Sequence, residues 1–66
     1  MKLVSHKFAD VTAVLEDMHG IAVEGQAKDL TPDMQSALLM SLRSSLADLQ
    51  RLLTGIGLLL KIGDGA

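Results

Sequence analysis

Asp29-Leu30-Thr31-Pro32-Asp33, near the middle of the 66-residue chain, marks the point where a helix begins. The hydroxyl of Thr31 can accept a hydrogen bond from an unpaired backbone N–H group of the first turn. Pro32 then falls at the first helical position, where its missing N–H group costs nothing. Asp33 adds negative charge at the positive end of the helix dipole. The segment therefore predicts a helix that starts at residue 32.

Apolar residues recur downstream of this start at alternating steps of three and four, which is the heptad spacing of packed helices. The repeated positions are Leu39, Leu42, Leu46, Leu49, Leu53, Ile56 and Leu60. The residues directly before four of these positions are Leu38, Ser45, Leu52 and Leu59. The apolar stripe is thus wider than a two-stranded coiled coil requires and is typical of a helix inside a bundle.

The same alternation runs upstream of the loop. The repeated positions are Val4, Phe8, Val11, Leu15, Met18 and Ala22, and they are flanked by Lys7, Val14 and Ile21. The pattern predicts an all-α fold, an antiparallel helical hairpin with helices at about 3–27 and 32–62, in a single domain spanning 1–66. Gly20 and Gly25 leave open whether the first helix is broken or ends early, and residues 63–66 are expected to form a C-cap and tail.

Composition excludes several classes of protein. The chain has no cysteine, so a small core cannot be reinforced by disulfides or by thiolate metal ligands. A net charge of -2 offers no basic excess for a dedicated nucleic-acid binder. His6, Lys7 and Asp10 interrupt any signal-peptide core, and the apolar run 52–60 is about half of the ~20 residues that a membrane span needs. We therefore expect a cytoplasmic protein without membrane contact.

The width of the stripes predicts self-association. One antiparallel neighbour covers two of the three apolar positions in each heptad, and we expect a lone hairpin to leave five side chains uncovered, namely Val14, Ile21, Leu38, Leu52 and Leu59. Exposing several side chains of this size forfeits on the order of 10 kcal/mol, which is comparable to the stability of a small domain. Pairing two hairpins into a four-helix bundle recovers most of that free energy, and twofold homodimers are the commonest assembly.

The expected oligomer interface draws on both helices. It comprises Phe8, Val11, Leu15, Met18, Leu38, Leu42, Leu46, Leu49, Leu52, Leu53, Ile56, Leu59 and Leu60. Met40, Leu58 and Ile62 lie off the stripe and form a possible surface for a partner protein.

Residues that carry chemistry are sparse. Glu16 and His19 have the Glu-x-x-His spacing of di-iron bundles, but the second helix has no Glu to complete such a site. His6 and Asp10 are one turn apart and provide two ligands at most. No His lies on the second helix to activate its serines. We therefore expect no enzyme, no metal and no cofactor.

The function predicted from the sequence is that of a small, non-enzymatic protein–protein interaction or regulatory module that acts as a homodimeric helical bundle. Two alternatives stay open. Arg43, Arg51 and Lys61 could touch RNA phosphates, as in small copy-control regulators. The chain could also be a subunit or co-chaperone of a hetero-complex.

Overall fold

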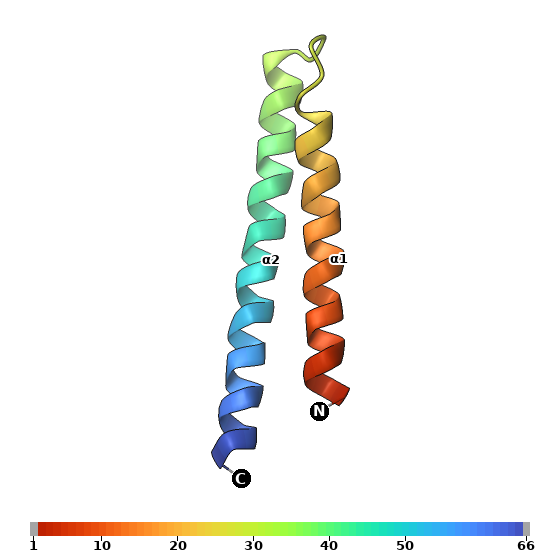
Figure 1. Cartoon of the computed structure of the whole chain (residues 1–66). Coiled ribbons are helices and arrows are strands. Elements are labelled where there is room, and N and C mark those ends of the chain that lie inside the picture. Colours follow the sequence, from red (N-terminus) through yellow and green to blue (C-terminus); the bar gives the residue numbers. More distant parts are fainter. Residues whose placement is uncertain (1, 66) are drawn as a thin grey trace.

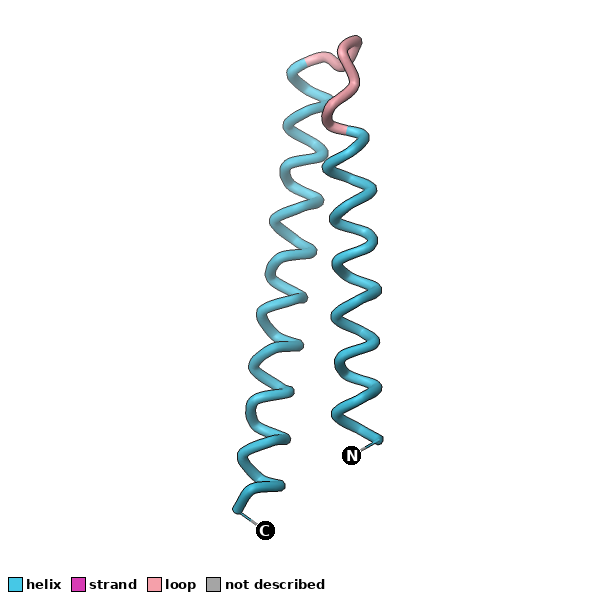
Figure 2. The backbone as a smooth tube through the Cα atoms, in the orientation of Figure 1, coloured by secondary structure: helices cyan, strands magenta, loops and turns pink. Residues whose placement is uncertain are grey.

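The computed structural model describes the backbone of residues 2–65 and the side chains of residues 3–62. Two helices, α1 (Lys2–Glu24) and α2 (Pro32–Gly65), lie side by side and run in opposite directions (Figure 1). The connection at 25–31 is the irregular stretch at one end of the tube in Figure 2. The predicted all-α helical hairpin is confirmed, whereas the four-helix bundle stays a prediction.

The start of α2 is built as the sequence predicts. The Thr31 hydroxyl accepts a hydrogen bond from the Met34 N–H group at 3.2 Å, and the Thr31 carbonyl accepts one from the Gln35 N–H group at 3.0 Å. Thr31 is therefore the N-cap, with Pro32 at the first helical position and Asp33 in the first turn.

The ends of both helices differ from the predicted bounds of about 27 and 62. α1 continues through Gly20 without a break and ends at Glu24, directly before Gly25, which is the early end that the sequence left open. The Gly25, Gln26 and Ala27 N–H groups then bond back to carbonyls three or four residues earlier, which closes the chain into tight turns. The C-cap and tail expected over residues 63–66 are wrong for residues 63–65, because α2 continues to Gly65 and no described glycine has the positive φ of a left-handed cap. Ala66 lies outside the described residues.

The two helices meet along a face that we call the contact face, made of the less exposed heptad positions of both helices. On α1 it comprises Val4, Lys7, Val11, Val14, Met18 and Ile21. On α2 it comprises Leu38, Leu42, Ser45, Leu49, Leu52, Ile56 and Leu59. Within residues 3–62, Val4 at 9% exposure and Ile56 at 5% are the buried apolar side chains, and both lie near the end opposite the loop.

The contact face corrects one expectation. Val14, Ile21, Leu38, Leu52 and Leu59 were expected to be left uncovered in a lone hairpin, but they are partly buried between the helices. The reason is that each wide stripe contains two overlapping heptad seams, and the antiparallel hairpin uses the seam that contains these five residues. The side chains left uncovered are those of the other seam.

The hairpin is slender rather than globular. Its extents are 54 × 15 × 10 Å and its Cα radius of gyration is 15.7 Å. A compact 66-residue domain has a radius of gyration of about 11 Å. Two helices side by side cannot enclose a core on all sides, so much apolar surface remains in contact with solvent.

Candidate functional site

One side of the hairpin carries a continuous row of apolar side chains that α1 and α2 do not bury against each other. We call it the outer apolar face. It comprises Phe8, Leu15, Ala22, Leu39, Leu46, Leu53 and Leu60, spaced seven residues apart on each helix. All seven are exposed, with Phe8 at 52% and Leu46 at 45%. None of them is charged or polar.

The residues that α1 and α2 contribute to the outer apolar face lie on the same side of the hairpin for a geometric reason. Each of its residues directly follows a contact-face residue, as Phe8 follows Lys7 and Leu53 follows Leu52. An antiparallel pair has an approximate twofold axis perpendicular to the plane of its helices, so equivalent heptad positions lie on one side. A shallow groove lined by Ala22 and Leu39 together agrees with this placement.

The side chains of the outer apolar face form layers across the two helices. The Leu38 methyl group lies 3.8 Å from the point where a Cβ atom on Gly25 would be, which sets these two residues opposite each other. Counting from this contact in opposite directions along the helices brings three pairs of the outer apolar face to within about two residues of the same height. These pairs are Ala22 with Leu39, Leu15 with Leu46, and Phe8 with Leu53.

The outer apolar face is hollowed at the loop end. A groove of about 320 Å³ opens there. It is lined by Ile21, Ala22, Gly25, Gln26, Gln35, Leu38, Leu39 and Leu42. The hollow exists because Ala22 and Gly25 project little or no side chain where the other layers carry Phe or Leu. We call it the loop-end groove.

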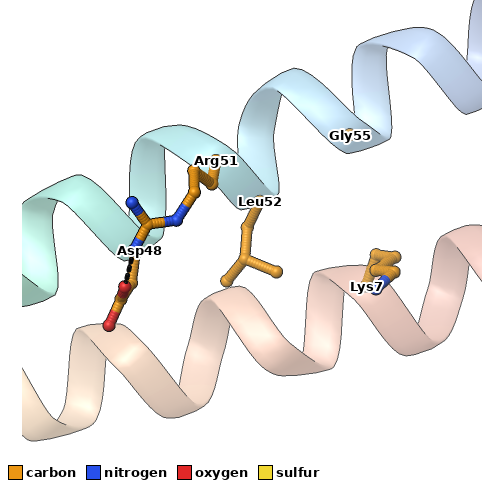
Figure 3. Close-up of a pocket in the computed structure, with 5 residues that line it drawn as sticks. All are labelled: Lys7, Asp48, Arg51, Leu52 and Gly55. Carbon is orange, nitrogen blue, oxygen red and sulfur yellow. Dashed lines mark hydrogen bonds and ion pairs between the residues drawn. The ribbon is translucent and has the colours of Figure 1, made fainter.

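The opposite side of the hairpin is polar. Asp10, Asp17 and Glu24 lie along α1, and Asp48 lies on α2. Arg51 pairs with Asp48 one turn away, and both side chains are more than half exposed. In Figure 3, Arg51 folds toward Asp48 while Leu52 reaches toward α1, above a groove of about 410 Å³ that Lys7 and Gly55 also line. These acidic side chains and Arg51 therefore lie away from the outer apolar face.

The predicted oligomer interface divides into two sets. Eight of its residues lie on the contact face between α1 and α2, namely Val11, Met18, Leu38, Leu42, Leu49, Leu52, Ile56 and Leu59. The other five lie on the outer apolar face, namely Phe8, Leu15, Leu46, Leu53 and Leu60. Leu39 and Ala22 complete that face but were not predicted in the interface. Their seven-residue spacing from Leu46 and Leu15 was the signal that could have identified them.

The predicted partner surface is not one patch. Met40, Leu58 and Ile62 are exposed at 70%, 57% and 69%. Leu58 and Ile62 are one turn apart near the end of α2, but Met40 lies roughly 27 Å away along the helix axis. The structure does not bring the three residues together.

The candidate chemical residues are all on the surface. Glu16, His19, His6 and Asp10 are exposed on α1, and no group of three or more His, Asp or Glu side chains within the described residues could hold a metal. Arg43, Arg51 and Lys61 are exposed on α2, and Asp48 neutralises one of them.

Within residues 2–65 neither helix combines the length and the apolar character needed to cross a bilayer. The chain was compared with protein-family models, with curated proteins and with solved structures, and no match was found in any of the three comparisons.

Proposed function

We propose that the chain is a non-enzymatic interaction module that works as a homodimer, in which two hairpins join through the outer apolar face to form a four-helix bundle. The observation that carries the proposal is the row of seven exposed, uncharged side chains at heptad spacing on one side of both helices. Apolar positions at three places in each heptad are those of a helix inside a bundle, and the hairpin alone covers two of them.

The solvent-exposed area of the hairpin is consistent with an interface to a second copy of the chain. The chain exposes 5107 Å². A compact monomer of this mass exposes about 4,000 Å². The excess is on the order of 1,000 Å², which is close to the roughly 800 Å² that each partner buries in a stable complex. A second hairpin of the same dimensions could therefore cover most of this excess.

The chemistry of the face also favours a copy of itself. A second copy repeats the same seven-residue spacing, so side chains of one face can fill the gaps of the other along their whole length. The outer apolar face has no charge, so two copies meet without repulsion across it. A lipid surface would instead favour several basic residues beside the apolar side chains. The flanking positions are Ser5, Thr12 and His19 on α1 and Ser36, Arg43, Gln50 and Gly57 on α2, so Arg43 is the one side chain among them that carries a permanent positive charge.

The test is the solution mass by light scattering over a hundredfold range of concentration, for the wild type and two variants. Leu46→Asp places a charge in the middle of the outer apolar face and is expected to weaken the dimer at least hundredfold. Met40→Asp, an equal change on the same helix at a side chain that is 70% exposed and outside the face, should leave the mass unchanged.

A wild-type chain that is monomeric at every concentration overturns the proposal. If that monomer sedimented with vesicles of anionic phospholipid, the face would belong to a membrane surface. If it did not, the face would belong to a different chain. Equal loss of dimer in both variants would also overturn the proposal, because the effect would then not be specific to the outer apolar face.

A further inference from the structure

We infer that the two hairpins of the dimer pack antiparallel, with the Phe8 ring of each copy filling the loop-end groove of the other. The inference rests on the proposed homodimer and adds its orientation. It follows from the unequal volumes of the three layers on the outer apolar face. The groove is incomplete until the second copy supplies a side chain to it.

The face is bulky at one end and hollow at the other. The layer farthest from the loop holds Phe8 with Leu53, and the layer nearest the loop holds Ala22 with Leu39 beside the loop-end groove of about 320 Å³. The middle layer holds two leucines, Leu15 and Leu46. The face therefore has a protrusion and a matching recess at the same distance from its centre, two turns on either side of the middle layer.

An antiparallel dimer matches these features. A twofold axis through the middle layer places Phe8 of one copy over Ala22 of the second copy, and Leu53 over Leu39 of the second copy. Each outer layer of the bundle then contains one Phe, two Leu and one Ala, and the central layer contains four Leu. Interiors pack at nearly constant density, so equal layers close without large voids or overlaps.

A parallel dimer distributes the same side chains unevenly. It collects two Phe8 rings and two Leu53 side chains in one layer, and two Ala22 and two Leu39 side chains in another. The two loop-end grooves then face each other, and neither copy supplies an aromatic side chain to fill them. Unfilled voids are destabilising in proportion to their volume.

The absence of cysteine makes the orientation directly measurable. Lys28 lies in the loop and is exposed, so Lys28→Cys carries one spin label per copy without touching either face. In an antiparallel dimer the two loops lie at opposite ends, and the labels should be roughly 40 Å apart by pulsed dipolar spectroscopy. In a parallel dimer both loops lie at one end, and the labels would be within about 20 Å.

An exchange of the two residues tests the contact itself. Phe8→Ala leaves a void and Ala22→Phe overfills the groove, so each change alone should weaken the dimer about tenfold or more. In the antiparallel dimer the double variant Phe8→Ala/Ala22→Phe restores the match between copies, and its dissociation constant should return to within about threefold of the wild type. In a parallel dimer the two positions lie in separate layers, and the losses would add.

The outcomes separate the two proposals. A monomeric wild-type mass overturns the homodimer and with it the orientation. A dimeric mass with a short label distance, or with additive losses in the double variant, overturns the orientation alone. A dimeric mass with the long distance and a restored double variant supports both.

Discussion

Thr31 starts α2 with its own side chain, because its hydroxyl accepts the Met34 N–H bond at 3.2 Å. Thr31→Ala removes this acceptor and leaves an unpaired N–H group in the first turn. We expect the variant to lower the free energy of unfolding by about 1 kcal/mol. Urea unfolding followed by circular dichroism measures the change. Thr31→Ser keeps the hydroxyl and should remain close to the wild type, and an equal loss in both variants would contradict the role of the cap.

Individual residues explain which helix ends could be predicted from the sequence. The start of α2 depends on neighbouring residues alone, and Thr31 and Pro32 predicted it correctly. The end of α1 could not be placed in the same way, because Gly20 and Gly25 carry the same local signal. Gly20 is in open space within the helix, whereas Gly25 ends it beside Leu38 of the other helix. That difference comes from tertiary packing, which no local pattern contains.

Each helix as a whole shows why the hairpin was predicted but its contact face was not. Alternating steps of three and four residues establish that each helix is amphipathic. On α1, however, the seams through Val4, Phe8 and Val11 and through Val4, Lys7 and Val11 both satisfy this spacing. The antiparallel approach of α2 selects the second seam, and Lys7 therefore lies in the contact face. Composition alone favoured the seam through Phe8, because Phe8 is apolar and Lys7 is charged.

Lys7 is partly buried in a contact face that is otherwise almost entirely apolar. A lysine in such a seam lowers stability relative to an apolar residue, because it buries less apolar surface against the neighbouring helix. We expect Lys7→Met, which keeps the length of the side chain, to raise the free energy of unfolding by about 1 kcal/mol. Lys28→Met is the matched control at an exposed loop position and should change the free energy of unfolding little. Urea unfolding of both variants at one protein concentration checks the expectation, and equal shifts would contradict it.

The whole molecule buries little surface as a single slender hairpin. Among residues 3–62 no side chain is less than 2% exposed, and the radius of gyration exceeds that of a compact domain of this length. Most of the stability should therefore come from association, as in obligate homodimers.

Thermal stability should accordingly depend on protein concentration. A hundredfold increase in concentration should stabilise the dimer by about 2.7 kcal/mol and raise its Tm by roughly 10 °C. Circular dichroism melts at several concentrations measure this shift. Leu46→Asp should melt at a lower temperature that does not change with concentration. A wild-type Tm that is constant over the range would contradict the coupling of folding to association.

Val4 and Ile56 lie far from the loop, and we expect them to come together late when the hairpin closes. Bringing them together in one step would enclose roughly fifty residues of flexible chain, at a high cost in entropy. When the helical turns beside 25–31 pair first, each further pair of turns needs only a few more residues to become ordered. The contact between the helices then extends from the loop toward the opposite end. The contact between Val4 and Ile56 is then expected to form last. Contacts that form after the transition state affect the unfolding rate more than the folding rate. The contact between Val4 and Ile56 is therefore expected to govern the lifetime of the closed hairpin.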